Sequence, residues 1–409
     1  MIKRFLDLQY LGIFIVVLMC QLTDVGFYGI KAGEMIVLFA FPFVLMNIGA
    51  IKRSRVIIFI YLFIFIIICT LVKNPLVDFY PPAAVDNFFK EPYFISLIRF
   101  IELLLCAIAY VYVYMLCKNS KMVKNVDAHT VVNIFLNQNA LFGVVFLIAL
   151  IFSYAGIDLG LTYGENHRVK GFFVEGGPLG SFYASLLCLD LVVNRKVRIA
   201  SIIFFLVILA AQSKAAVFLI VVYFLVYALF SNMSLKSKAI PVIFSLMIAG
   251  IGYFFYSDLL MGYVVDSMDI EKSLIGREND PNITMGRISG AFIGYNIIVD
   301  NPIFGVGLGN YSLVRNNPDY LGFFPPVELW DLTGLGMYTI QVENGLLGML
   351  AFIYCFRYFY IRLESSIAKS ASLIPVICVF FGTQFYFIYI WVILGFAIGI
   401  SCFIRRDEV

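Results

Sequence analysis

Long apolar runs recur along the whole chain, and they constrain its fold more than any other feature. A helix needs about 20 mostly apolar residues to cross the hydrocarbon core of a bilayer. Only 13% of the 409 residues are charged, against about 25% in ordinary soluble domains. The sequence therefore excludes a soluble enzyme and predicts an all-α polytopic membrane protein of about 12 transmembrane helices. The predicted spans are 8–24, 33–50, 56–72, 94–117, 131–155, 178–194, 199–212, 215–230, 240–256, 338–356, 371–386 and 389–404.

Two long apolar runs are each divided into two spans because of their length. The run 199–230 would be about 48 Å long as one helix, which is too long for a single crossing. We therefore predict a break at Gln212-Ser213-Lys214, and a second break near 386–388 inside the run 371–404.

Basic residues test this order of spans independently. Alternate connections hold 18 of the 29 basic residues, which the positive-inside rule assigns to the cytoplasm together with both termini. These clusters are Lys3/Arg4, Lys52/Arg53/Arg55, Lys118/Lys121/Lys124, Arg195/Lys196/Arg198, Lys236/Lys238, Arg357/Arg362/Lys369 and Arg405/Arg406. We expect one integral membrane domain over 1–409, with one large extracytoplasmic loop at 257–337 between the ninth and tenth spans. A loop of that length usually carries function or has structure of its own.

Several cations on the predicted outer side need an explanation. We expect Lys31, Lys90 and Lys272 to belong to solvated loop faces. Arg99 differs because it lies inside the fourth span with Glu102 one turn later. Charges within a membrane usually face a polar interior and mark a site, although a structural Arg99–Glu102 pair is the alternative. Lys214 lies in the predicted break, where it is a site cation or an ordinary turn lysine.

Two further stretches suggest an external anion site. Arg168 and Lys170 precede Glu175-Gly176-Gly177-Pro178, and backbone amides of a glycine turn can add donors for an anion. Arg287 begins a segment with helical apolar spacing that Pro302 ends. A cation in the first turn of a helix is disfavoured unless an anion is also present, although a solvent-facing arginine explains the pattern equally well.

Other chemistries lack support in the sequence. A net charge of +3 gives no argument for nucleic acid, and two histidines are too few for a histidine-built metal site. We expect no metal and no cofactor, so arginines would have to neutralise any phosphate leaving group. The eight cysteines lie in or beside apolar runs and are expected to be small hydrophobic residues rather than disulfide partners.

Four stretches, in this order, resemble the O-antigen polymerase/ligase family of bacterial envelope glycosyltransferases. Each stretch is weak by itself, but the ordered set covers most of 160–360. The stretches are Arg168-x-x-Gly171 followed by Pro178; Gln212-Ser213-Lys214; Arg287 through Asp300-Asn301-Pro302-Ile303-Phe304-Gly305-Val306-Gly307; and Glu343-Asn344-Gly345-Leu346-Leu347-Gly348. Lys214 stands where the family usually has arginine. The ligase branch has a histidine near 334–336, and this chain has none in 257–409, which favours a polymerase.

The resemblance implies transfer of a growing glycan from undecaprenyl diphosphate to the non-reducing end of another lipid-linked repeat unit, in O-antigen or related polysaccharide biosynthesis. It places the protein in the bacterial inner membrane with a periplasmic active site, and it leaves room for a chain-length regulator as a further partner. Arg168 and Arg287 would stabilise charge on the leaving diphosphate, with Glu343, Glu175 or Asp331 as the base. Diphosphate or glycan binding would involve Lys170, Lys214, Arg99 and Asn301. A lipid-linked oligosaccharide flippase or other secondary transporter, and an O-antigen ligase, are the alternatives.

Overall fold

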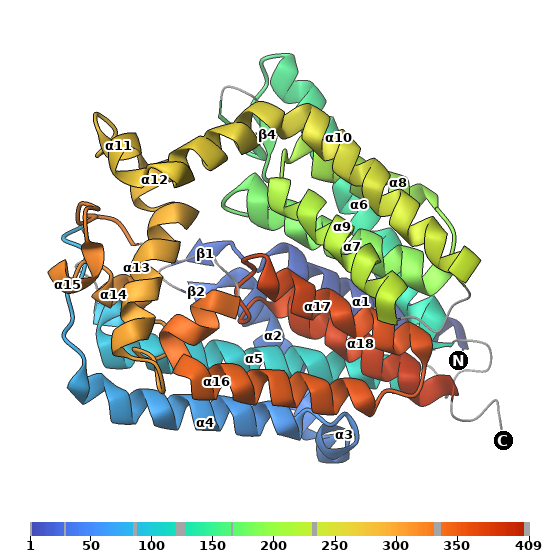
Figure 1. The fold of residues 1–409 in the computed structure, drawn as a ribbon. Coiled ribbons are helices and arrows are strands. Elements are labelled where there is room, and N and C mark those ends of the chain that lie inside the picture. The colour runs from blue at the N-terminus through green and yellow to red at the C-terminus, as the bar shows by residue number, and fades with distance from the viewer. Residues whose placement is uncertain are drawn as a thin grey trace.

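The computed structural model describes residues 2–27, 30–84, 88–119, 127–164, 167–230, 235–330 and 337–404, and within these ranges the chain is mostly helical (Figure 1). The longer helices are α1 (Ile2–Gln21), α2 (Ala32–Leu45), α4 (Ile57–Lys73), α5 (Pro92–Asn119), α6 (Ala128–Tyr154), α7 (Gly176–Asn194), α8 (Ile199–Ala210), α9 (Lys214–Phe230), α10 (Leu235–Met268), α13 (Arg287–Asp300), α16 (Met337–Ile361), α17 (Ser366–Phe380) and α18 (Ile388–Ile404).

Short elements connect these helices. They are α3 (Ile48–Arg53), α11 (Ile270–Leu274), α12 (Pro281–Thr284), α14 (Tyr311–Val314), α15 (Pro318–Leu321) and the 3-10 turns η1 (Asn74–Leu76) and η2 (Phe88–Lys90). Two antiparallel ribbons also form, β1 (Gly26–Phe27) with β2 (Ile30–Lys31) and β3 (Thr162–Tyr163) with β4 (Arg168–Val169).

Every predicted span coincides with an apolar helix in the described ranges. Five of these helices are long and apolar enough to cross a membrane: Ile57–Leu76, Pro92–Lys118, Ala128–Tyr154, Gly176–Asn194 and Tyr338–Ile361. The others are apolar but shorter, so a total of twelve crossings stays a prediction. Both predicted breaks are confirmed, because α8 ends at Ala210 before α9 begins, and α17 ends at Phe380 before α18 begins.

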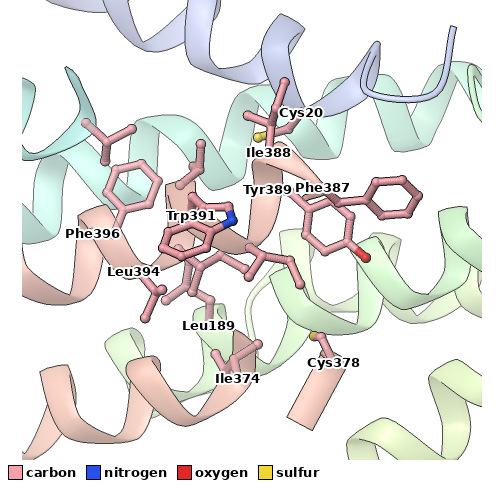
Figure 2. Close-up of a cluster of buried hydrophobic side chains, with 14 of the residues drawn as sticks. Cys20, Leu189, Ile374, Cys378, Phe387, Ile388, Tyr389, Trp391, Leu394 and Phe396 are labelled. Carbon is pink, nitrogen blue, oxygen red and sulfur yellow. The ribbon is translucent and has the colours of Figure 1, made fainter. Parts of the chain in front are cut away.

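Helix α18 lies at the centre of the apolar core. Its Trp391 is fully buried and packs edge-on against Phe59 and Phe63 of α4, with ring centroids 5.1 and 5.2 Å apart. The indole Nε1 donates to the Phe385 carbonyl at 2.7 Å, so burial of the ring leaves no polar atom unsatisfied. Figure 2 shows the apolar side chains that surround this part of α18. A helix that is apolar on all faces is expected at such a central position.

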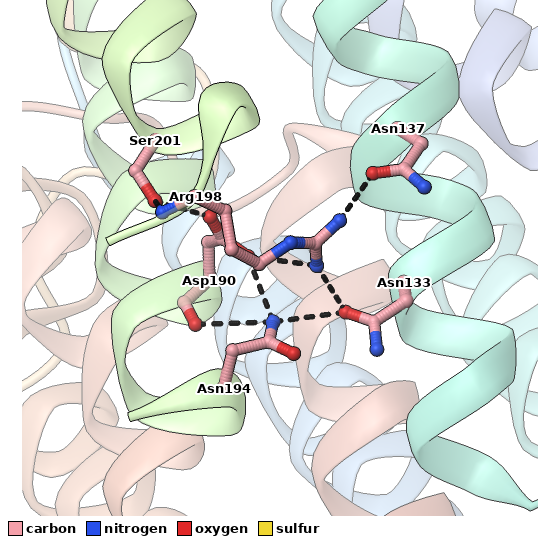
Figure 3. Close-up of polar contacts among 6 residues, drawn as sticks. All are labelled: Asn133, Asn137, Asp190, Asn194, Arg198 and Ser201. Carbon is pink, nitrogen blue, oxygen red and sulfur yellow. Dashed lines mark hydrogen bonds and ion pairs between the residues drawn. The ribbon is translucent and has the colours of Figure 1, made fainter. Parts of the chain in front are cut away.

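One end of the bundle gathers the cations predicted for the inner side. Arg198, before α8, pairs at 3.1 Å with the fully buried Asp190 of α7 and also bonds Asn133 and Asn137 of α6 (Figure 3). Arg55 donates to the Arg362 carbonyl at the same end. We call this region the basic end; Lys121, Lys124, Arg405 and Arg406 lie outside the described residues. Its cytoplasmic orientation stays a prediction from the positive-inside rule.

The opposite end holds the segment predicted as a large loop. Helix α10 continues to Met268, past the predicted loop start at 257, and α11 to α15 follow. These elements enclose a second apolar cluster, which includes Ile293, Ile297, Val306 and Val342. The segment therefore has a core of its own and presents a structured surface beside the ends of the long helices (Figure 1).

Candidate functional site

Arg168 is held against the break between α8 and α9. In the β3–β4 ribbon it lies opposite Tyr163, and its guanidinium lies over the Tyr163 ring at 5.2 Å. Its Nη2 donates to the carbonyl of Ala211, the residue that ends α8, at 3.3 Å. Its buried Nε has no partner among the described residues. The side chain is thus positioned by the protein while one donor stays available.

The Gly-Gly-Pro turn brings α7 against the same break. A Cβ at Gly176 would lie 2.5 Å from the Ala211 carbonyl oxygen, so only glycine allows this approach. Ser213 Oγ donates to the Gly177 carbonyl at 3.2 Å, and the Gly176 amide donates to the Tyr163 hydroxyl at 3.2 Å. We predicted that amides of this turn could bind an anion; the Gly176 amide instead has a partner inside the protein.

Lys214 is under the electrostatic influence of two arginines from distant parts of the sequence. It begins α9 directly after the break, where Gln212 has φ +49°, and it lies between the two predicted spans. Burial, and then repulsion from Arg168 and Arg287, lower the pKa of Lys214. Arg287 is exposed in the first turn of α13, and no side chain caps that helix. The electrostatic field of both arginines therefore reaches Lys214, and we call Arg168, Lys214 and Arg287 the cation cluster.

Helix α16 is broken at Gly345, and the loop that follows α13 forms backbone hydrogen bonds on both sides of this break. Gly345 has φ +64° and ψ −169° inside α16. The carbonyls of Val342 and Glu343 accept from the amides of Val306 and Gly307 at 3.1 and 2.7 Å. Beyond the break, the amides of Leu346 and Leu347 donate to the carbonyls of Pro302 and Ile303 at 2.9 and 3.2 Å. Irregular backbone in a membrane protein needs such internal partners.

The same loop is fastened to α4 and α5 on its other side. The Leu308 amide donates to Thr70 Oγ1 at 3.0 Å, and Ser96 Oγ donates to the Leu308 carbonyl at 2.9 Å. Asn310 Nδ2 donates to Asn74 Oδ1 at 2.8 Å. The Asn-Pro-x-x-Gly-x-Gly stretch therefore connects three long helices.

Comparison with known families applies to this part of the chain. Residues 199–353 match the family model described as O-antigen ligase. The matched range contains the break at Lys214, the Arg287 helix and the broken α16, and it confirms the resemblance to the O-antigen polymerase/ligase family. Members of this family are membrane enzymes of the glycosyltransferase type, and the apolar helices agree with a membrane protein. No curated protein matches the chain.

Glu343 lies inside the matched range 199–353, directly before the break in α16. Its side chain is buried, faces the backbone amides of Gly309 and Tyr311, and lies in the positive field of Arg99. It lines a small cleft together with Thr339, Thr383 and Tyr386, among others. Asp331, the other base candidate in this range, lies outside the described residues.

Arg99 belongs to a buried ion network outside the matched range. Its Nη1 pairs with Glu102 at 2.6 Å, as the structural alternative predicted, and its guanidinium lies over Tyr386 at 4.2 Å. Lys31 pairs with Glu102 at 3.0 Å and with Glu34 at 3.6 Å. Because Tyr386 lies under the Arg99 guanidinium and also lines the cleft of Glu343, the network adjoins that cleft.

Two predictions about exposed cations were wrong. Lys31 lies in that network rather than on a solvated face, because two carboxylates compensate its burial. Lys90 lies over the Trp330 ring at 3.6 Å. Both predictions failed because Glu102 and Trp330, which contact Lys31 and Lys90, are remote from them in the sequence. Lys272 is exposed, as predicted.

The remaining predicted site residues have more local surroundings. Glu175 is the N-cap position of α7, where its side chain is exposed and makes no capping hydrogen bond. Lys170 is half-buried, and its backbone amide pairs with Leu161. Asn301 Nδ2 donates to the Ile297 carbonyl at 3.3 Å and to the Tyr320 hydroxyl at 3.2 Å. The side-chain amide nitrogen of Asn301, at the end of α13, therefore forms its hydrogen bonds with other residues of the protein.

Proposed function

We propose that this protein is a polysaccharide polymerase of the bacterial inner membrane. It transfers a growing glycan from undecaprenyl diphosphate to the non-reducing end of another lipid-linked repeat unit, at the periplasmic face. The observation that carries the proposal is the cation cluster: Lys214 lies in the repulsive field of Arg168 and Arg287. A diphosphate is the kind of ligand that would offset this repulsion.

The reaction needs one bond formed and one broken. An acceptor hydroxyl oxygen attacks the anomeric carbon of the donor glycan, and the bond from that carbon to the diphosphate oxygen breaks. Negative charge then develops on undecaprenyl diphosphate, where Arg168, Arg287 and Lys214 would stabilise it. Arg168 is suited to this role because its Nε has no partner among the described residues.

The acceptor proton needs a base. We assign Glu343 to this role because its carboxylate lies directly before the break in α16 and faces the backbone amides of Gly309 and Tyr311. Glu175, exposed at the start of α7, is the second candidate. Lys170 would contribute to substrate binding, whereas the positive field of Arg99 acts on the carboxylate of Glu343.

A ligase is the second candidate function, since the matching family model describes O-antigen ligase. The two reactions share a donor and differ in the acceptor, which is another lipid-linked repeat unit for a polymerase. The absence of histidine from 257–409 of the sequence supports the polymerase, because the ligase branch has one near 334–336.

Reconstitution separates these functions. Purified protein in liposomes would receive lipid-linked repeat units, a chelator and no nucleotide sugar, and the products would be separated by chain length. A polymerase yields a ladder that is lost in Arg287→Ala and kept in Lys272→Ala, the matched change of an exposed cation. A second reaction would also contain a glycolipid acceptor that is not a repeat unit. Transfer only to that acceptor would establish a ligase, whereas movement of intact units across the bilayer would establish a flippase.

A further inference from the structure

A cavity of about 510 Å³ lies at the basic end of the bundle, far from the cation cluster along the helices. It is lined by residues at the ends of α7, α9 and α16 and in the first turns of α17. Its volume is within the usual range for small-molecule sites. None of its lining residues takes part in the proposed transfer reaction.

Two cations from different helices line this cavity. Arg195 follows α7, and Lys369 lies in the first turns of α17 with its ammonium 5.9 Å from the Tyr360 ring. Glu364 is also part of the lining, so these three charges leave one net positive charge. That balance suits a ligand with a single negative charge, such as one phosphodiester.

Arg195 is held in an unusual backbone conformation. Its φ is +52° at the C-terminal end of α7, a position where glycine is the ordinary residue. Strained non-glycine backbone tends to persist where the side chain has a task. Here the exposed arginine side chain is presented to the cavity.

The walls of the cavity are amphipathic. Tyr227, Phe230 and Tyr360 line it, and aromatic side chains favour the level of the lipid headgroups. Beside it, Leu229 and Phe230 at the end of α9 are 75% and 66% exposed, and Ile361 of α16 is 61% exposed. Apolar surface continuous with a charged cavity indicates an amphiphile rather than a free anion.

We propose that this cavity binds the headgroup of a singly charged anionic phospholipid of the phosphatidylglycerol class. Arg195 and Lys369 contact the phosphodiester, and the acyl chains lie along the exposed apolar ends of α9 and α16. Basic cavities between helices on the cytoplasmic side are general lipid headgroup sites. This site goes beyond the transfer reaction and does not depend on it.

Thermal unfolding of the purified full-length protein in a neutral detergent tests the proposal. We expect phosphatidylglycerol to raise the unfolding midpoint, and Arg195→Gly and Lys369→Gln each to reduce that rise by at least half. Arg195→Gly is informative because glycine suits the backbone at this position, so the variant should fold. Arg357→Gln, a change of an exposed cation of the same end that does not line the cavity, should keep the full rise.

Four results would overturn the proposal. The first is an equal rise with zwitterionic phosphatidylethanolamine, and the second is an equal rise with soluble glycerol phosphate, which would indicate a free anion. The third is an undiminished rise in both cavity variants. The fourth is an equal loss in Arg357→Gln, which would indicate unspecific surface binding.

Discussion

The backbone amide of Gly307 donates a 2.7 Å hydrogen bond to the carbonyl of Glu343, and this bond joins the loop after α13 to the break in α16. This bond fixes the backbone of Glu343, the proposed base, against the Asn-Pro-x-x-Gly-x-Gly stretch. Two stretches that looked like separate motifs in the sequence are therefore one structural unit, and its geometry can be tested independently of catalysis.

Gly305→Ala should damage this unit. Gly305 has φ +67°, and a Cβ there would lie 2.5 Å from the carbonyl carbon and oxygen of Glu343. Backbone strain of this kind costs about 1–3 kcal/mol before any clash is counted. We expect a lower unfolding midpoint and loss of polymer. Gly262→Ala is the matched control, because a Cβ at Gly262 meets nothing within 4 Å; equal midpoints for the two variants would contradict this account.

Lys214→Ala should separate stability from activity. Removing this ammonium relieves its repulsion by Arg168 and Arg287, so the protein without substrate should be as stable as the wild type or slightly more so. Polymer formation should nevertheless fall by about ten- to a hundredfold, since one stabiliser of the leaving diphosphate is lost. Unfolding midpoints and initial rates measure the two effects. Full activity of the variant would show that Lys214 is an ordinary turn lysine.

The two carboxylate candidates can be ranked by isosteric changes. Glu343→Gln keeps the shape of the side chain but removes its basicity, so we expect the chemical step to slow by about a hundredfold, the size usual for a lost base. Glu175→Gln should change the rate by less than about threefold if its exposed side chain has no such role. Single-turnover rates with saturating donor give the comparison, and the reverse order of effects would transfer the role to Glu175.

Removing one charge from the buried ion network should lower the stability of the protein more than removing both charges of a pair. Glu102→Gln leaves Arg99 and Lys31 without their shared carboxylate, and breaking a buried pair in this way costs about 3–5 kcal/mol. The double change Arg99→Met with Glu102→Met removes both charges of the closest pair and should cost less than Glu102→Gln alone. Thermal unfolding in detergent measures this difference, and additive losses would show that the pair is not coupled.

Lys90 gives a pH dependence of stability. It lies outside the predicted spans, and burial, followed by repulsion from Arg99, lowers its pKa from 10.5 to about 8. Between these values the unfolded chain binds more protons than the folded one, so the free energy of unfolding rises with pH in this window. The wild type should therefore gain stability relative to Lys90→Gln between about pH 8 and about pH 10.5. A constant difference in unfolding midpoint would refute the effect.

The sequence by itself determined the class of fold and the place of its helices. Apolar runs must form helices in a bilayer because each helix satisfies its own backbone polar groups, so hydropathy alone locates 8–24 through 389–404 to within a few residues. Length was enough to locate the breaks at 212–214 and near 386–388. The Arg99–Glu102 pair was also predictable, since residues three apart share a helix face.

Only the tertiary structure decided which side chains meet. The partners of Lys31, Lys90 and Gly307 lie in other helices or loops, and periodicity along one segment carries no information about such neighbours. The approach of Arg168 to Lys214 depends on glycine at 176 touching the end of α8, a close contact between backbones that no local pattern specifies. Helix formation in this protein is a local property, whereas its charge groups result from how the helices pack.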